Sequence, residues 1–154
     1  SFPRAPGGMS GRRKKMRDWQ SLSHVKWESK YHIVWVPKYR RKVLFGKVRR
    51  RAGEIIRELC RQRELEIIEG HSMPDHIHAC ISIPPKYSVA NAIGFLKGKS
   101  AIRLHREFGA LGMGKHFWIG GYNVSTVGLN EEQIRKYLRE QEYLDKQQME
   151  LDLR

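Results

Sequence analysis

Hydrophobic positions in the first half of the chain alternate between the period of a strand and that of a helix. YHIVWVP at 31–37 is β-branched and aromatic and predicts a strand closed by proline. Apolar residues from Val48 to Leu59 recur at helical spacing, which predicts an amphipathic helix reaching about residue 63, with Arg and Glu on its other face. LEIIEG at 65–70 and HIHACISIP at 76–84 then predict two strands paired as a hairpin across HSMPD.

The second half shows the same alternation. Ser88 can cap a helix over 88–108 whose apolar stripe ends at the glycine-rich stretch 109–115. HFWIGGYNVSTV at 116–127 predicts a fourth strand interrupted at Gly120 and Gly121. Asn130 and Gln133 resemble a capping box, and the following 131–148 is a strong helix former.

The predicted order is strand, helix, strand, strand, helix, strand, helix. This order is typical of an α+β fold of the ferredoxin-like, split βαβ type: an RRM-like antiparallel sheet with two helices on one face. An additional C-terminal helix would carry Tyr137. We expect one domain over 25–154, preceded by a basic flexible segment over 1–24, of which residues 1–8 look like an expression remnant and are set aside.

The charge balance points to a polyanionic partner. Thirty Lys and Arg against sixteen Asp and Glu give the 154 residues a net charge of +14, spread along the chain. No apolar run is long enough to span a bilayer, and no signal-peptide pattern is present. We therefore expect a cytoplasmic protein that meets nucleic acid, without a membrane partner, whose Cys60 and Cys80 stay reduced.

The stretch PDHIHACISIPP at 74–85 carries the first candidate chemistry. Because strand side chains alternate, its isoleucines share one face, and His76 and His78 share the other. The apolar face must meet the helices, so the two imidazoles lie side by side on the open face, close enough to bind one cation. An H-x-H pair on a half-exposed strand is also often incidental, and imidazoles suit zinc as well as other metals.

The last helix supplies the second set of candidates. Its stripe of Ile134, Tyr137, Leu138, Gln141 and Leu144 needs a surface to cover, and the open sheet face is available. Tyr137 and Gln141 lie four residues apart and so on the same side of the helix. With the histidines they suit metal-assisted attack of a tyrosine on a phosphodiester, although a core tyrosine and a surface amide explain them equally well.

The chain resembles a known family at several places. MPDHIHACISIP is similar to the HUH motif of histidine, hydrophobic residue, histidine. Together with YHIVWVPKYRRKVL, SVANAIGFLKGKSA, HFWIGGYNVSTVG and IRKYLREQ, it resembles, in order, the blocks of the single-tyrosine transposases of the insertion-sequence 200/605 family. The resemblance runs from about Val25 to Leu144.

The resemblance implies a full mechanism. His76, His78 and Gln141 would be ligands of Mg²⁺ or Mn²⁺, and Tyr137 would be the nucleophile that cuts and rejoins single-stranded DNA through a 5′-phosphotyrosine. It further implies recognition of DNA hairpins at the element's ends by a homodimer with shared active sites, in a bacterial or archaeal cytoplasm and without a nucleotide cofactor. A domesticated relative that processes repeated extragenic hairpins would need the same site.

Other signals are less specific. The basic residues Arg40, Arg41, Lys42, Lys97 and Lys99 could contact DNA phosphates or form a solvated face. GFLKGKS at 94–100 has the wrong glycine spacing for a phosphate loop and lies in a helical pattern.

The other histidines and Asp75 are interpreted as structural residues. His24, His32, His71, His105 and His116 have no partner at ligand spacing. Asp75 is interpreted as a turn residue rather than a ligand, and a role in supporting the ligands is the alternative. A non-catalytic RRM-like nucleic-acid-binding module is the rival class, but such a module carries aromatic residues where HIHACISI has histidines.

Overall fold

The structure is a computed structural model that describes residue 2 and residues 29–38, 44–109 and 116–152. Its strands are β1 (Ser29–Trp35), β2 (Glu66–Met73), β3 (His76–Ile83) and β4 (Asn123–Ser125); its helices are α2 (Gly46–Gln62), α3 (Val89–Phe108) and α4 (Glu131–Asp152). No helix in these ranges is long and apolar enough to cross a membrane.

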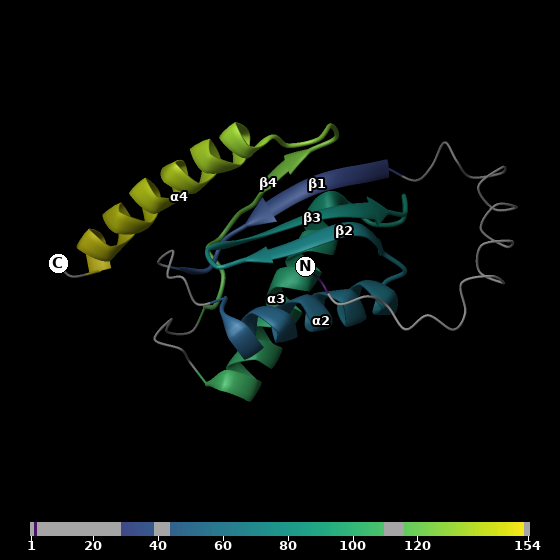
Figure 1. The fold of residues 1–154 in the computed structure, drawn as a ribbon, viewed down its shortest axis with the longest axis horizontal. Coiled ribbons are helices and arrows are strands. Elements are labelled where there is room, and N and C mark those ends of the chain that lie inside the picture. Colours follow the sequence, from purple (N-terminus) through teal and green to yellow (C-terminus); the bar gives the residue numbers. More distant parts are fainter. Residues whose placement is uncertain (1, 3–28, 39–43, 110–115, 153–154) are drawn as a thin grey trace, which may run out of the picture.

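The four strands form one antiparallel sheet in the order β2-β3-β1-β4. The two central strands are therefore β1 and β3, and β4 forms one edge. Helices α2 and α3 lie together on one face of this sheet, and α4 lies on the opposite side (Figure 1). Order and layering confirm the predicted α+β, ferredoxin-like fold with an additional C-terminal helix.

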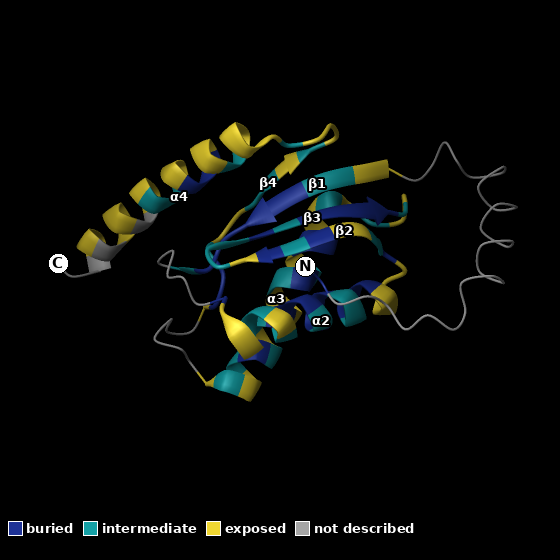
Figure 2. Ribbon diagram, in the orientation of Figure 1, coloured by how far each residue is buried: buried dark blue, intermediate teal, exposed yellow. Residues whose placement is uncertain are grey.

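The face covered by α2 and α3, here called the closed face, contains the main core. Most of its strand residues are buried branched or aromatic side chains, and Figure 2 shows parts of the central strands and of the two helices in the dark blue of buried residues. Each such side chain contributes about 1.5–3 kcal/mol by leaving water. The buried residues contributed by strands and helices to this core include Ile33, Trp35, Ile77, Ile81, Ile55, Ile56, Leu59, Ile93, Leu96 and Leu104.

The other face, here called the open face, has a small cluster among the described residues. Val34 and Val36 pack there against Tyr137 and Leu138 of α4, each of which is 7% exposed. Farther along the helix Leu144 is 54% exposed. The prediction that α4 covers the open face is thus correct only for its first half; the second half extends past the sheet (Figure 1).

The β2–β3 hairpin is longer than the sequence predicts. Gly70 does not end β2: it pairs with Ala79, and the strand continues to Met73, so that only Pro74 and Asp75 form the turn. The absence of a side chain at Gly70 makes room for Phe2, because a Cβ there would lie 2.5 Å from the ring. Phe2 is 8% exposed, so part of the segment set aside in the sequence packs into the core.

The predicted fourth strand is divided. Trp118 forms an isolated bridge with Pro37, whereas the ladder with β1 comprises only Asn123–Ser125. Between them Gly121 has φ +94°, a conformation that L side chains rarely adopt and that turns the chain. The helix caps follow the prediction: Ser88 Oγ accepts from the Asn91 amide, and Asn130 and Gln133 bond reciprocally.

Candidate active site

The histidine pair lies on the open face of β3, as the alternation predicts. Ile77 and Ala79 belong to the closed-face core, which leaves His76 and His78 on the other side. The His76 side chain is 12% exposed, and its Nδ1 lies 2.9 Å from Asp75 Oδ1. An ionised carboxylate accepts a hydrogen bond from an N–H group, so the Nδ1–H of His76 donates to Asp75. The lone pair of Nε2 is then available to a metal ion. Asp75, confirmed as a turn residue, thus also orients His76.

Two further histidines flank His78 across the sheet. The ring centroids of His32 on β1 and His71 on β2 lie 6.0 and 6.1 Å from that of His78. His71 Nε2 is also 2.6 Å from Glu69 Oε1. His32 and His71 thus have an imidazole neighbour in space that their spacing along the chain does not reveal, because that spacing ignores strand pairing. Counting outward from a two-residue turn at 74–75 would have placed His71 opposite His78.

The environment of His78 favours its neutral form. Burial lowers the pKa of this imidazole, and the neighbouring His32, His71 and His76 lower it further. A neutral imidazole keeps the lone pair that a metal ion needs. The chemistry of the pair therefore fits a divalent cation.

The rest of a metal site is not assembled from the usual ligands. Within the described residues, no group of three or more His, Cys, Asp and Glu side chains is arranged to hold a metal ion. The two imidazoles thus need a further donor of another kind, such as an amide oxygen or a phosphate oxygen. Both are ordinary ligands of hard divalent cations.

Tyr137 on α4 lies against β1, the strand next to the histidine-bearing β3, and its side chain is buried there. Its ring packs on Val34 and Val36, and Val34 is the register partner of His78. Burial raises the pKa of Tyr137 to about 12, and its buried Oη has no hydrogen-bond partner among the described residues. An unpaired buried hydroxyl costs free energy, which a purely structural residue such as Phe would avoid.

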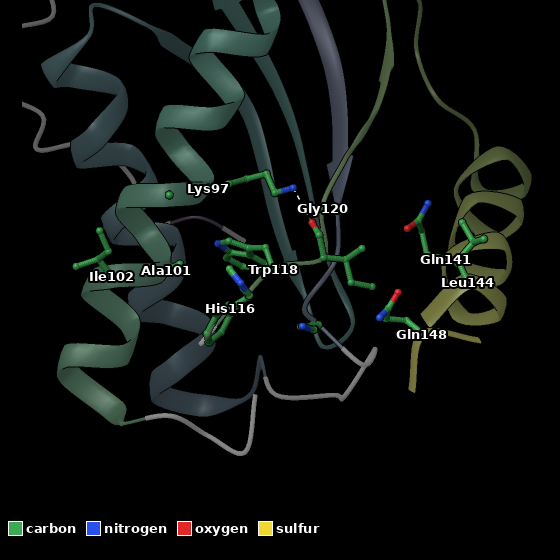
Figure 3. A pocket seen from close by; sticks show the side chains of 13 residues that line it. Lys97, Ala101, Ile102, His116, Trp118, Gly120, Gln141, Leu144 and Gln148 are labelled. Atoms are coloured by element: carbon green, nitrogen blue, oxygen red, sulfur yellow. Dashed lines mark hydrogen bonds between the residues drawn. The ribbon is translucent and has the colours of Figure 1, made fainter. Parts of the chain in front are cut away.

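Gln141 faces a different part of the molecule. It lines a pocket of about 670 Å³ between α3, residues 116–120 and α4, and neither His76 nor His78 is part of that lining. Figure 3 shows the Gln141 side chain pointing from α4 toward the segment that contains Gly120. The structure therefore brings His76 and His78 together and Tyr137 to the neighbouring strand, but leaves Gln141 on the pocket side.

Of the five basic residues predicted to contact DNA, the structure describes two, Lys97 and Lys99. Lys97 is half-buried, and its Nζ donates to the carbonyls of Ile119 and Gly121 at 2.6 Å each, which gives this ammonium group a structural role. Lys99 is exposed on the same helix. Arg40, Arg41 and Lys42 lie outside the described residues.

These features define a class of protein: a ferredoxin-like domain whose open sheet face carries a histidine pair beside a helix that bears a tyrosine. The family of IS200-like transposases matches this chain over residues 25–141. The chain belongs to that family. The transposase for insertion sequence element IS200 of Salmonella typhimurium is 43% identical over 141 residues, covering 90% of this chain and 93% of that protein.

Other relatives agree. The ISDra2 transposase TnpA of Deinococcus radiodurans is 35% identical over 107 residues, which are 67% of this chain and 76% of that protein. A crystal structure from D. radiodurans, assigned as a transposase, superposes with a TM-score of 0.67 at 25% identity, covering 91% of this chain and 98% of the other. A REP-associated tyrosine transposase bound to a REP hairpin shares the fold, with a TM-score of 0.50 at 16% identity over 71% and 62% of the two chains.

Proposed function

We propose that this transposase cuts and rejoins single-stranded DNA with Tyr137 as its nucleophile. The observation that carries the proposal is the buried Tyr137 hydroxyl, which has no hydrogen-bond partner among the described residues and lies on α4 against β1, the strand that pairs with the histidine-bearing β3. The +14 charge favours a DNA substrate, and the structural relative bound to a hairpin supports hairpin ends as the part that is recognised.

The chemistry conserves phosphodiester bonds. Tyr137 Oη attacks the scissile phosphorus as the bond to the 3′ oxygen breaks; the phenol loses its proton, and the leaving oxygen gains one to become a 3′-OH. The phosphate stays on the 5′ oxygen of the downstream strand, now joined to the protein. A second 3′-OH reverses the step, so joining needs no nucleotide cofactor.

We assign His76, His78 and Gln141 as ligands of Mg²⁺ or Mn²⁺. A bound cation would polarise the scissile phosphate. Asp75 orients His76 through Nδ1, and burial lowers the pKa of His78, which favours its neutral form. Gln141 would have to leave the pocket side, and Tyr137 to leave its enclosure on β1, when DNA binds.

A shared site in a homodimer is consistent with two exposed features. Within the described part of the chain, strand β4 pairs with β1 alone and no strand lies along its other edge, and Val124 in β4 is 43% exposed. The distal half of α4 also presents Leu151, which is 60% exposed. A second copy could cover both and place the tyrosine helix of one subunit at the histidines of the other.

The direct test uses hairpin-bearing single-stranded DNA from the flanks of the gene, with Mg²⁺ or Mn²⁺. A 3′-end label should travel with the denatured protein, and a 5′-end label should be released with a free 3′-OH. Tyr137→Phe should abolish the adduct, whereas Tyr143→Phe, an exposed tyrosine on the same helix, should keep it. An adduct with Tyr137→Phe would refute the nucleophile, and no adduct with either metal would refute the reaction.

Assembly of the site can be tested by mixing two inactive variants. If the site is shared, Tyr137→Phe and His78→Gln chains together should regain adduct formation, since one hybrid site is intact. Failure of the mixture, with both variants folded and each inactive alone, would place the whole site within one chain.

A further inference from the structure

Two exposed apolar side chains flank the turn that leads into the histidine pair. Phe45, at the start of α2, is 54% exposed, and Met73, at the end of β2, is 39% exposed. The Leu44 amide donates to the Pro74 carbonyl at 3.3 Å, so the start of α2 meets the turn between β2 and β3 (Figure 1). Phe45 and Met73 are here called the turn patch. Exposed apolar side chains that gather beside candidate chemistry are typical of ligand contacts.

Met73 places the turn patch beside one of the proposed metal ligands. It is the register partner of His76 in the ladder between β2 and β3. Side chains of paired residues lie on the same face of a sheet, with Cβ atoms about 4.5–5.5 Å apart. A phosphate bound near the His76 imidazole would therefore have Met73 as a neighbour.

The backbone around Phe45 is held from two directions. Leu44, the residue before it, is fully buried in the closed-face core. The Phe45 carbonyl accepts from the Val48 and Arg49 amides at 3.0 and 3.2 Å. From β2, Ser72 Oγ donates to the Arg49 carbonyl at 3.2 Å. The ring of Phe45 thus projects from an ordered backbone, so little further ordering is required when a ligand packs on it.

The first turn of α2 supplies positive charge next to the ring. Lys47 and Arg50 are exposed, and no acidic residue lies in this turn. Asp75, the acidic residue of the adjacent hairpin turn, lies 2.9 Å from His76 Nδ1. An exposed ring with basic residues beside it suits single-stranded nucleic acid, whose bases stack on aromatic side chains while cations contact its backbone. None of these residues belongs to α4, so the patch does not require the tyrosine helix to stay on its own β1.

We propose that Phe45 stacks on one unpaired base of the single-stranded DNA, close to the phosphate that Tyr137 attacks. The inference rests on the proposed function and adds a residue that positions the strand beside the histidines. Met73 gives the strand a further apolar contact next to His76. Stacking accepts any base, because every base has a π face, so this contact positions the strand and leaves sequence recognition to other groups.

The test measures binding without cleavage. The Tyr137→Phe protein is titrated with fluorescent single-stranded DNA from the element's end, in which one abasic site is moved through the nucleotides around the cut. Adding Phe45→Ala should weaken binding of intact DNA about five- to a hundredfold, the range expected for loss of one stacked base. One abasic position should cause a similar loss by itself, and Phe45→Ala should add little there. Phe45→Tyr keeps an aromatic ring and should bind within about twofold of the parent.

Ile68→Ala is the matched control, because Ile68 is an exposed apolar residue of the same hairpin, nearer the start of β2. It should bind as the parent does at every position. Phe45 is exposed, so Phe45→Ala should unfold in urea as the parent does, which separates a loss of binding from a loss of folding. The abasic scan on the parent needs no substitution at Phe45 and gives an independent measurement.

Three outcomes would overturn the stacking contact: a scan with no sensitive position, equal losses in Phe45→Ala and Ile68→Ala, or losses that add fully at every abasic position. Adduct formation is measured separately on the chain with Tyr137 present. Any of these outcomes beside a normal adduct rejects the role of Phe45 and leaves the proposed function standing. A protein that neither binds single-stranded DNA nor forms the adduct would reject both.

Discussion

The two faces of the sheet follow opposite rules although they share the same strands. On β3, Ile77 and Ile81 point into a core with no exposed surface, whereas His76 and His78 alternate with them toward the open face. The closed face is apolar and covered by helices. The open face carries several imidazoles, the Asp75 carboxylate that contacts His76, and the buried tyrosine. One strand thus supplies both stability and the candidate chemistry, with the pleat keeping the two apart.

The energetic logic of the faces also differs. Each closed-face side chain stabilises the folded state when it leaves water. On the open face, His78 is partly desolvated among other imidazoles and the Tyr137 hydroxyl is buried without a partner, and both arrangements cost stability. Groups that a stable fold does not need are candidates for function.

The largest effect should come from comparing one substitution on each face of β3. Ile81→Ala removes a fully buried side chain and should lower the free energy of unfolding by about 2–5 kcal/mol. His78→Gln, three residues away on the open face, should change stability by less than about 1 kcal/mol but abolish the DNA adduct. Urea unfolding and the adduct assay measure the two; a large stability loss in His78→Gln would contradict the division of the faces.

The next effect concerns how the open face is prepared for a metal ion. Asp75→Asn removes the carboxylate that orients His76 and should weaken Mn²⁺ binding about 10- to 100-fold, measured by calorimetry or electron paramagnetic resonance. Glu69→Gln is the control, since Glu69 bonds His71 and not a proposed ligand. Equal losses of Mn²⁺ affinity in both variants would contradict the proposed ligands and would place the ion between His71 and His78 instead.

The sequence predicts the fold better than the site, for reasons that particular residues make clear. Element types and the closed-face stripe follow from local periodicity, and Ser88 and Asn130 mark helix starts through local hydrogen bonds. What failed was non-local: Gly70 stays in the ladder by pairing with Ala79, and the ring of Phe2, far away in the chain, lies where a Cβ at this position would be.

The site shows the same limit. The H-x-H pair is readable because alternation is a property of one strand, but the flanking His32 and His71 depend on strand register. The position of Gln141 depends on where α4 crosses the sheet, which helical spacing does not determine. Spacing placed Tyr137 and Gln141 on one side of the helix, and the structure shows that this side meets both β1 and the pocket.

A smaller effect should come from the link between the two faces. Lys97 belongs to α3 on the closed face but bonds the turn that leads toward β4 and α4. Lys97→Met leaves two carbonyls without this donor and should cost about 1–2 kcal/mol, whereas Lys99→Met, exposed on the same helix, should be neutral. Urea unfolding of the two variants gives the comparison.

The pH dependence of this link has a definite sign. Burial lowers the pKa of Lys97 to about 8, below its value of 10.5 in the unfolded chain. Between these values the unfolded chain binds more protons, so stability from this group rises with pH. The difference between wild type and Lys97→Met should therefore widen from pH 8 to 10.5, and a constant difference would show that the ammonium group is not desolvated.

The smallest effect is expected to be a gain. Tyr137→Phe removes a buried hydroxyl that has no hydrogen-bond partner among the described residues, so it should raise the free energy of unfolding by up to about 1 kcal/mol at pH 7 while abolishing the adduct. Burial raises the pKa of this phenol to about 12, so between pH 10 and 12 the folded chain keeps a proton that the unfolded chain releases. Wild type should lose stability over that range relative to Tyr137→Phe. The control Tyr143→Phe, at an exposed tyrosine of the same helix, should show no gain at pH 7. A loss of stability in Tyr137→Phe at pH 7 would mean that the hydroxyl stabilises the fold, and its burial would then no longer point to a function.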